Sequence, residues 1–452
     1  MRTLPIWLAV LAAPSAAQVA LPGGPIALPA TLDRAVPTET LPAIDLARLE
    51  AEDAQAGRSG PWRFGVEIPT QFDLADSGAW TLGADGERVW RLRLSAPGAA
   101  SISLEFDAWV LPEGASVCLY DDARETVYGS YGAHNNKPDG QMAILPFPGD
   151  ALTIEYVEPA ELAGEAQLSI GTVVHGYRDV FARIAKQDEQ GSFAGSGSCN
   201  VDINCPDGAE WQDEKRAVAR TFTGGFLCTG ALINNTAQDG TQYFLSANHC
   251  GSMNSTVFLF NYERTGCGSG SVNGGQSVQG SSLVATGSSS DYRLVRINSN
   301  IPDSYGVYFA GWNRSSQAPS GSVGIHHPSG DTKKICFDFN APTKSGSNWR
   351  IANWELGVTE GGSSGSPLFN PDGQIIGQLC CGQAFCGFPV NDYYGRFELA
   401  WNAYSSSLDP IGSGATSIGG WDPNGGGGTP PVVPCSVTAY GAGAVANIGT
   451  LS

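Results

Sequence analysis

Residues 361–369 read Gly-Gly-Ser-Ser-Gly-Ser-Pro-Leu-Phe, a glycine-rich turn that carries serines and leads into an apolar strand. Glycine permits a sharp turn, so the backbone N–H groups of Gly362 and Ser364 can converge on one point. Two such donors form an oxyanion hole, in which each is typically worth roughly 3–4 kcal/mol during acyl transfer. A turn of this kind before a strand is usually an ordinary hairpin, so its meaning depends on two segments that precede it.

A histidine that could act as the base for this serine ends an apolar strand. Residues 243–250 read Tyr-Phe-Leu-Ser-Ala-Asn-His-Cys, which places His249 directly before Cys250. A general base must be held within hydrogen-bond reach of its nucleophile. A disulfide from Cys228 to Cys250 would hold the loop that presents the imidazole. The chain has only five histidines, which limits the competition for this role.

An aspartate that opens an alternating strand completes the set. Residues 291–297 read Asp-Tyr-Arg-Leu-Val-Arg-Ile, and Asp291 would orient the imidazole and stabilise its charged form. The order His249, Asp291, Ser364, with steps of 42 and 73 residues, is the chymotrypsin-type order of a catalytic triad. Each residue alone has a commonplace explanation. Together they favour an all-β, chymotrypsin-like fold of two six-stranded β-barrels that meet at a cleft.

The composition agrees with a mostly β protein and excludes some partners. The chain has 452 residues with 59 glycines and 28 prolines, which favours short strands joined by many turns. Its net charge of −19 repels nucleic acid and anionic lipid, so we expect neither as a partner. The remaining histidines and cysteines lack the convergent spacing of a zinc site. We therefore expect no metal and no cofactor.

The N-terminal residues are typical of a secretory signal. Arg2 is followed by a short apolar run over residues 4–13, and the small residues Ser15 and Ala17 are spaced for cleavage before Gln18. The alternative is a short buried strand. The 11 cysteines suit an oxidising compartment with disulfides. We expect a secreted, extracellular protein with residues 1–17 removed and with no segment that spans a membrane.

Two domains and a tail follow this signal. Residues 18–186 contain a β-rich domain, in which the alternating polarity of residues 89–94 and 102–106 is typical of a β-sandwich. A polar linker leads into residues 187–422, which hold the candidate triad. Residues 423–452 form a Gly/Pro-rich linker and a C-terminal tail that is too short to fold alone.

Further motifs resemble those of bacterial lysyl endopeptidases, which are chymotrypsin-fold enzymes that cleave after lysine. The resemblance covers about residues 195–415, in the segments 197–206, 243–250, 310–312, 325–328, 357–360, 363–367 and 392–396. It implies a serine endopeptidase that is made as a zymogen, with residues 18–186 as its pro-region. Its partners would be protein or peptide substrates and its own pro-region, and we expect a monomer. The implied disulfides are Cys199–Cys386, Cys205–Cys267 and Cys228–Cys250.

Asp392 is the residue that the resemblance assigns to the recognition of lysine. Trypsin-like enzymes have an aspartate six residues before the catalytic serine, where this chain has Val358. A desolvated carboxylate that faces an ammonium is a strong recognition pair; without the resemblance, Asp392 would be taken for a solvated turn residue. For Glu360, a role in the pocket and a role on the surface are both open. Trp349 and Trp354 are both candidates for the tryptophan expected near the substrate.

One segment departs from the family pattern. Where the family has a histidine and two glycines, this chain has Cys380-Cys381-Gly382, in a segment expected to pair with the substrate backbone in β fashion. An extra disulfide there would reshape the pocket, so cleavage after both lysine and arginine is the alternative specificity. Cys336 is a candidate partner for Cys380 or Cys381. Cys435 has no assigned partner.

Lys186 lies in the polar linker just before the second domain. A lysine-specific enzyme could cut there and release its own pro-region.

Two other classes of protein stay open: a secreted binding protein on an inactive protease fold, and a secreted esterase. The esterase is disfavoured because in α/β-hydrolases the nucleophilic serine precedes the acid.

Overall fold

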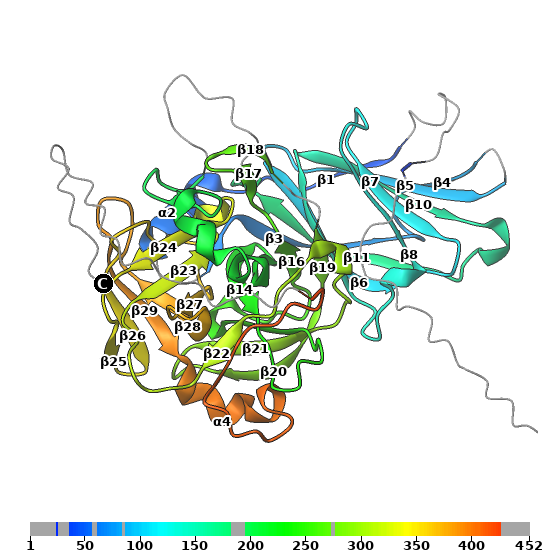
Figure 1. The fold of residues 1–452 in the computed structure, drawn as a ribbon. Coiled ribbons are helices and arrows are strands. Elements are labelled where there is room, and N and C mark those ends of the chain that lie inside the picture. The colour runs from blue at the N-terminus through cyan, green and yellow to red at the C-terminus, as the bar shows by residue number, and fades with distance from the viewer. Residues whose placement is uncertain are drawn as a thin grey trace, which may run out of the picture.

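The computed structural model describes residues 24–25, 36–56, 61–83, 86–181, 195–272 and 276–425. These residues form an N-terminal domain (residues 36–181) and a protease domain (residues 195–425), which lie side by side in Figure 1. Among them, no helix is long and apolar enough to cross a membrane. The signal, Lys186 and Cys435 lie outside the described residues.

The N-terminal domain is a sandwich of two mainly antiparallel sheets. One sheet has the order β1 (Thr38–Thr40), β5 (Arg88–Ser95), β10 (Ala151–Glu158), β7 (Ser116–Tyr120) and β8 (Val127–Gly132), with β4 (Ala79–Leu82) also paired to β5. The other has the order β3 (Gly65–Asp73), β11 (Gln167–Gly176), β6 (Ser101–Val110) and β9 (Met142–Pro148). Between them lies a core built around Trp90, Trp109 and Tyr156. Helix α2 (Leu46–Ala56) follows β1 in the chain and precedes the remaining strands.

The protease domain contains two large curled sheets. The first has the order β19 (Ser277–Gln279), β16 (Val257–Phe260), β13 (Val218–Thr223), β14 (Phe226–Leu232), β15 (Tyr243–Ala247), β21 (Tyr292–Ile297) and β20 (Ser281–Gly287). The second has the order β12 (Val201–Asp202), β24 (Lys334–Asp338), β23 (Ser322–His326), β27 (Pro367–Phe369), β28 (Gln374–Gly382), β29 (Val390–Arg396), β26 (Asn348–Asn353) and β25 (Thr343–Ser345).

Shorter elements complete this domain. They are the ribbon β17 (Arg264–Gly266) and β18 (Ser269–Val272), the strands β22 (Gly311–Asn313) and β30 (Ser417–Ile418), and the helices α3 (Glu214–Ala217) and α4 (Phe397–Leu408). The architecture is the chymotrypsin-like double barrel that the sequence predicted. The sheets count 8 and 10 strands rather than six each, because short edge strands extend them and because β2 (Trp62–Arg63) of the N-terminal domain pairs with β14.

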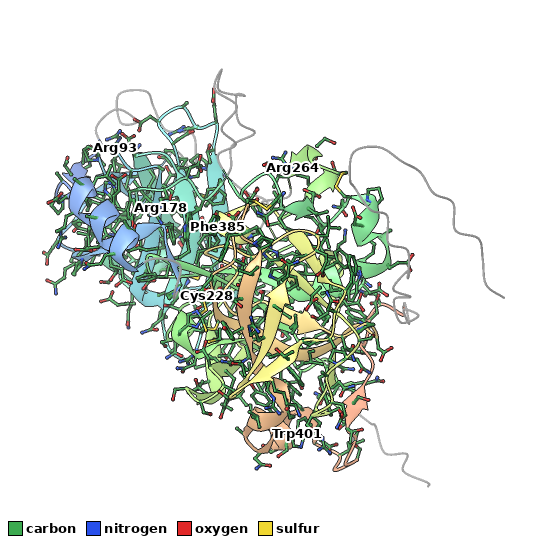
Figure 2. The ribbon with its side chains drawn as sticks, turned by 90° about the vertical axis from the view of Figure 1, so that its left-hand side faces the viewer. Arg93, Arg178, Cys228, Arg264, Phe385 and Trp401 are labelled. Atoms are coloured by element: carbon green, nitrogen blue, oxygen red, sulfur yellow. A yellow bond between two sulfur atoms is a disulfide. The ribbon has the colours of Figure 1, made fainter. Side chains whose placement is uncertain are left out.

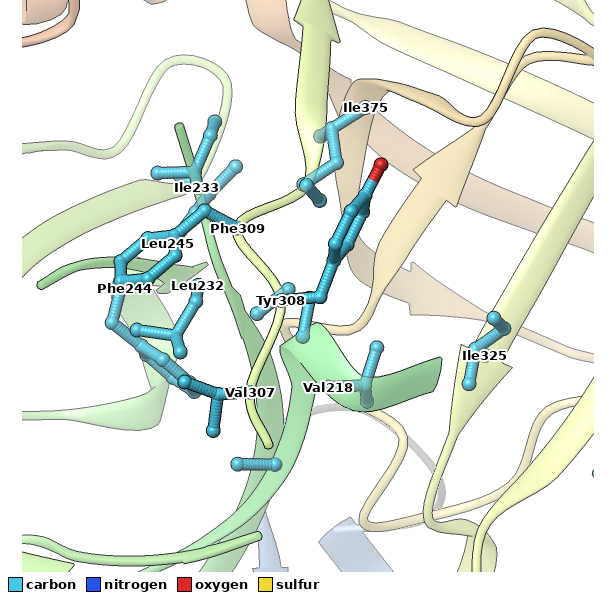
Figure 3. Packing of buried hydrophobic residues seen from close by; sticks show 14 of the residues in the cluster. Val218, Leu232, Ile233, Phe244, Leu245, Val307, Tyr308, Phe309, Ile325 and Ile375 are labelled. Carbon is cyan, nitrogen blue, oxygen red and sulfur yellow. The ribbon is translucent and has the colours of Figure 1, made fainter. Parts of the chain in front are cut away.

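A single apolar core joins the two sheets of the protease domain. Leu232 and Phe244 come from the first sheet, Ile325 and Ile375 come from the second, and all four belong to one buried cluster. The chain at residues 307–309 passes between the two groups, as Figure 3 shows. Because interiors are packed at crystal-like density, this core holds the two sheets in a fixed relation. The candidate catalytic residues belong to turns of both sheets, so the distances between them depend on this core.

A second apolar cluster crosses the boundary between the two domains. Phe64, Leu145 and Val174 of the N-terminal domain pack against Phe222 and Leu259 of the protease domain. Polar contacts surround this cluster: Lys137 Nζ donates to Gln279 Oε1 at 3.2 Å, and the buried Arg220 donates to the carbonyl of Val180 at 2.6 Å. Burial of apolar surface is the main favourable term in most protein association, so the two domains are held together firmly.

Candidate active site

His249 and Asp291 meet where strands β15 and β21 lie side by side. The carboxylate of Asp291 accepts the His249 backbone N–H at 2.9 Å through Oδ1 and contacts the ring Nδ1 at 2.5 Å through Oδ2. Asp291 has a left-handed φ of 51°, and its carbonyl accepts the N–H of Asn248 at 2.9 Å. The backbone is therefore fixed on both sides of the pair, which orients the imidazole.

The other ring nitrogen of His249, Nε2, is placed to accept a proton. With Nδ1 donating to Asp291, the neutral ring carries its lone pair on Nε2. That atom is buried and has no hydrogen-bond partner among the described residues. An oriented imidazole with an unpartnered, buried Nε2 is the arrangement that a general base requires.

Ser364 lies beside the disulfide that follows the histidine. Its carbonyl accepts the N–H of Thr229 at 2.8 Å and lies 3.8 Å from the sulfur of Cys250. Cys250 is bonded to Cys228 of β14. The serine turn, β14 and the histidine turn are thus tied together at one point, and Ser364 is 7% exposed.

Gly365 explains why the turn after Ser364 can approach so closely. Its φ is +81°, and a Cβ atom placed there would lie 2.2 Å from Ser246 Oγ and 2.4 Å from the carbonyl oxygen of Thr229. Both distances are far shorter than any real contact. The glycine that follows Ser364 is thus a requirement of the docked turn, both for its backbone angle and for its lack of a side chain.

Two buried polar residues, Ser363 and His326, stabilise this turn by hydrogen bonds. The hydroxyl of Ser363 accepts the backbone N–H of Glu360 at 3.2 Å and contacts His326 Nδ1 at 2.8 Å. Burial, aided by the charge of Lys334, lowers the pKa of His326 to about 3, so the ring stays neutral. The support of the serine turn by His326 was not predicted from the sequence. The only local pattern that could have indicated it is the pair of histidines followed by Pro328.

Asp392 is a buried carboxylate on strand β29 of the second sheet. It is 1% exposed, and Oδ2 accepts Trp354 Nε1 at 2.7 Å and Thr359 Oγ1 at 2.5 Å. Oδ1 accepts the N–H of Ala384 at 3.3 Å. Burial raises the pKa of Asp392, although these three donors oppose the shift. A Cβ on Gly382 would lie 1.8 Å from Oδ1, so glycine is needed for this approach.

The structure shows how Trp349, Trp354 and Glu360, whose roles the sequence left open, are placed relative to Asp392. Trp354 contacts the carboxylate, whereas Trp349 donates to the carbonyl of Ile376 at 3.2 Å and is buried in the core. Val358 is fully buried. Glu360 accepts the N–H of Gly197 at 2.9 Å. Its carboxylate also accepts the side-chain amide of Asn200 and the hydroxyl of Ser329, so Glu360 anchors the first residues of the protease domain.

The cysteines follow the pairing implied by the family resemblance in three cases and differ in one. Disulfides join Cys199–Cys386, Cys205–Cys267 and Cys228–Cys250. The expected pairing of Cys336 with Cys380 or Cys381 is wrong for this structure, because Cys336 is a free, fully buried thiol whose sulfur lies 3.6 Å from the carbonyl oxygen of Gly324. Cys380 and Cys381 instead contact each other at 2.7 Å.

A metal ion does not fit the cluster of Cys228, His249 and Cys250. Their ligand atoms lie within 4.8 Å of one another. However, cysteine binds metals as the thiolate, and both sulfurs here belong to the same disulfide, so neither can be a thiolate ligand. Only His249 could offer a ligand, and its Nδ1 already faces Asp291.

These features define a serine endopeptidase of the chymotrypsin-like fold. Comparison with known proteins adds the family. The family model "Lysyl endopeptidase, C-terminal domain" matches residues 193–395. The chain is 30% identical over 396 residues to a lysyl endopeptidase of Pseudomonas aeruginosa, a match that covers 77% of this chain and 82% of that protein. The chain belongs to the lysyl endopeptidase family.

Two solved structures are also similar to the chain. The thermostable serine protease AL20 from an extremophilic microorganism is 18% identical with a TM-score of 0.34, and the match covers 43% of this chain and 98% of that one. The human heparin binding protein is 15% identical with a TM-score of 0.33, and the match covers 43% of this chain and 92% of that one.

Proposed function

We propose that this protein is a secreted endopeptidase that hydrolyses peptide bonds after lysine and is made as a zymogen. The observation that carries the specificity is the buried carboxylate of Asp392, which is enclosed by Trp354, Thr359 and Gly382. The three disulfides agree with secretion, because such bonds persist in oxidising compartments.

The proposed mechanism is acyl transfer in two halves. His249 takes the hydroxyl proton of Ser364 through Nε2, and the serine oxygen attacks the scissile carbonyl. Asp291 holds the ring and stabilises the imidazolium that forms. The amides of Gly362 and Ser364 stabilise the oxyanion of the tetrahedral intermediate. The C–N bond breaks as His249 gives the proton to the leaving amine, which forms the acyl-enzyme. Water then attacks the acyl-enzyme, with His249 again acting as the base, and the serine hydroxyl is restored.

The geometry of the turn supports the assignment of the oxyanion hole. Gly362 has a φ of +90° and its carbonyl accepts the hydroxyl of Thr229 at 2.8 Å. The intervening amide of Ser363 points elsewhere, to the carbonyl of Glu360 at 3.0 Å. These two hydrogen bonds, to the carbonyl of Gly362 and from the amide of Ser363, hold the turn. The two amides that we assign to the oxyanion hole, those of Gly362 and Ser364, lie on either side of the Ser363 amide.

The buried carboxylate of Asp392 suits a lysine side chain for a physical reason. A buried, ionised carboxylate is costly unless a partner compensates it, and three neutral donors do so only in part, since burial still raises its pKa. A substrate ammonium would provide the missing charge. Val358 is fully buried at the position where trypsin-like enzymes have their aspartate, so the two specificity devices are different.

The contact between the two domains supports the zymogen proposal. Strand β2 pairs antiparallel with β14, placing Arg63 opposite Phe226 and Trp62 opposite Leu227, directly before Cys228. The N–H of Phe64 also donates to the carbonyl of Gly225 at 2.9 Å. The N-terminal domain therefore adds a strand at the edge of the catalytic region, which is the way that extended peptides bind exposed edges.

The same contact reaches the turn that carries the nucleophile. A Cβ on Gly361 would lie 2.8 Å from the indole of Trp62, so this ring packs directly on the turn. Next to it, a cleft of about 730 Å³ is lined by both domains, including Arg178 on one side and Glu360 and Phe385 on the other. Figure 2 places Arg178 and Phe385 at this junction. We infer that access to the site requires release of the N-terminal domain, with self-cleavage after Lys186 as the proposed first step.

A digest of an unstructured test protein, with every cut read by mass spectrometry, tests this function. Cuts only after lysine that disappear in Ser364→Ala would support the triad and the Asp392 pocket together. Cuts after lysine and arginine would support the triad with the broader specificity. If a folded and processed sample makes no cuts and Ser364 does not react with a fluorophosphonate, the proposed activity is refuted.

A further inference from the structure

Strand β28 ends in two consecutive cysteines whose sulfurs are in contact. Successive side chains of a regular strand point to opposite faces of the sheet, which would keep neighbouring thiols apart. Here the register shifts: Leu379 pairs with Tyr394 on β29, but Cys381 pairs with Tyr393, so Cys380 is an extra residue in a β-bulge. The two sulfurs lie 2.7 Å apart. The bulge thus removes the alternation that would separate them.

This pair lies between the two carboxylates of the candidate site. On one side, Gln378 of the same strand donates to the carbonyl of Ser290 at 2.7 Å, and Ser290 directly precedes Asp291, the acid of the triad. On the other side, the next residue, Gly382, pairs with Asp392 on β29. Both thiols are partly exposed, unlike the buried free thiols of Cys118 and Cys336 elsewhere among the described residues. A change in the pair would reach the triad and the pocket at once.

The chemistry of the two thiols differs in a way that suits an exchange reaction. The contact with Cys380 lowers the pKa of Cys381, because a neighbouring S–H stabilises the thiolate. The same contact, burial and the charge of Asp291 raise the pKa of Cys380. Since the thiolate is the nucleophile, Cys381 is the sulfur that would react first and Cys380 is the one that would resolve the product.

We propose that Cys380 and Cys381 form a reversible disulfide with each other, and that this bond lowers the turnover of the enzyme. The oxidant is a small disulfide such as oxidised glutathione. The Cys381 thiolate attacks one of its sulfurs and expels one glutathione thiolate, giving a mixed disulfide. Cys380 then loses its proton and attacks the Cys381 sulfur, which expels the second. The pair gives up two electrons and two protons, and the oxidised glutathione becomes two thiols.

Closure of this bond would alter the site in two ways. The sulfurs must move from 2.7 Å to about 2.05 Å, the length of a disulfide, and the intervening peptide must rotate with them. This peptide belongs to the segment proposed to pair with the substrate, so the inference rests on that part of the proposed function. In addition, the movement would reach the residue before Asp291, because Gln378 on the same strand donates to the carbonyl of Ser290 at 2.7 Å. A misplacement of about 1 Å near the chemistry can cost on the order of 100-fold in rate.

The bond would also be easily broken. Consecutive Cα atoms are about 3.8 Å apart, whereas relaxed disulfides join Cα atoms about 4.4–6.8 Å apart. A bond between neighbours is therefore strained, and strained disulfides are reduced more readily than structural ones. A mild thiol reductant should open it and leave the bridges Cys199–Cys386, Cys205–Cys267 and Cys228–Cys250 intact.

The test uses the secreted wild-type enzyme, Cys380→Ser and Cys381→Ser, with Cys118→Ala as a control that removes an isolated buried thiol. Each is exposed to oxidised glutathione or to a mild reductant and is then blocked with N-ethylmaleimide. Mass spectrometry of the peptide that carries residues 380 and 381 shows whether it is cross-linked or doubly blocked. The kcat/KM of each sample is measured in parallel.

In the oxidised wild type and in Cys118→Ala, we expect a cross-linked peptide and a kcat/KM that is lower by roughly tenfold or more and is restored by the reductant. In Cys380→Ser and Cys381→Ser, oxidation should leave kcat/KM unchanged. The proposal is overturned if both thiols remain blockable after oxidation, or if Cys381→Ser loses activity as the wild type does. If no sample cleaves peptides, the proposed function fails separately, because the peptide mass still decides whether the bond forms.

Discussion

Replacement of Asp392 by asparagine isolates the charge that we assign to lysine recognition. The side chain is 1% exposed, so no solvent would replace the lost charge. Asparagine keeps the shape of the residue, and its oxygen can take the place of Oδ2, which accepts both Trp354 and Thr359. Removing one partner of a buried, hydrogen-bonded charge pair costs about 2–5 kcal/mol. At 1.36 kcal/mol per tenfold, this predicts that kcat/KM for a lysine substrate falls by about 30- to 5,000-fold.

The assay compares peptide substrates with lysine or norleucine before the scissile bond. Norleucine keeps the aliphatic chain and lacks the ammonium, so the ratio of the two kcat/KM values measures the charge interaction alone. Asp392→Asn should abolish most of this ratio. Asp372→Asn, an exposed change in the turn between β27 and β28, should leave it unchanged.

One structural consequence of Asp392→Asn must be separated from recognition. With its oxygen in the place of Oδ2, the new NH2 group would face the N–H of Ala384, which now donates to Oδ1. An unsatisfied buried donor costs about 1–3 kcal/mol, so thermal unfolding of the variant should be measured as well. If Asp392→Asn is folded and still prefers lysine over norleucine as strongly as the wild type, the assignment of this carboxylate to the ammonium is refuted.

Three further predictions concern the turn, the linker and the boundary between the domains. Gly365→Ala should lower kcat/KM by about 100-fold or more, because the nucleophile must shift; Gly412→Ala, which has a similar positive φ and open space around it, should not. Lys186→Gln should slow the release of the N-terminal domain, and N-terminal sequencing of the wild type should begin one residue after Lys186. Burial raises the pKa of Glu105, which accepts the N–H of Gly224 across the boundary. The associated state therefore binds the proton of Glu105 more tightly than the separated domains do. Size-exclusion chromatography of the processed complex should show weaker association as the pH rises from the usual pKa of glutamate through the raised pKa of Glu105. Glu105→Gln should reduce that pH dependence.

Much of the candidate site could be predicted because its groups belong to local motifs. The histidine at a strand end before a cysteine, the aspartate that opens a strand and the glycine-rich serine turn are each visible within nine residues. Each motif reflects a local need, such as the positive φ at Gly365 or the disulfide at Cys250. The all-β class followed from the same kind of evidence, since alternation and turn residues are short-range signals.

The residues that support the site could not be found in this way. The contact of His326 with Ser363 spans 37 residues and that of Trp354 with Asp392 spans 38, and neither has a sequence pattern of its own. The predicted pairing of Cys336 failed for the same reason, because a count of cysteines does not tell which sulfurs the strands bring together.

The sequence by itself determined the β class of the fold, the presence of a glycine-rich turn and the order of the candidate catalytic groups, because these depend on residues that are neighbours in the chain. Only the tertiary structure decided that Asp392 is buried against Trp354 and Thr359. Only it showed that a strand of the N-terminal domain pairs with β14 beside the nucleophile, and that a bulge brings Cys380 and Cys381 into contact. Such features depend on which strands pair and in which register, and this is settled by the packing of the whole core rather than by any local stretch of the chain.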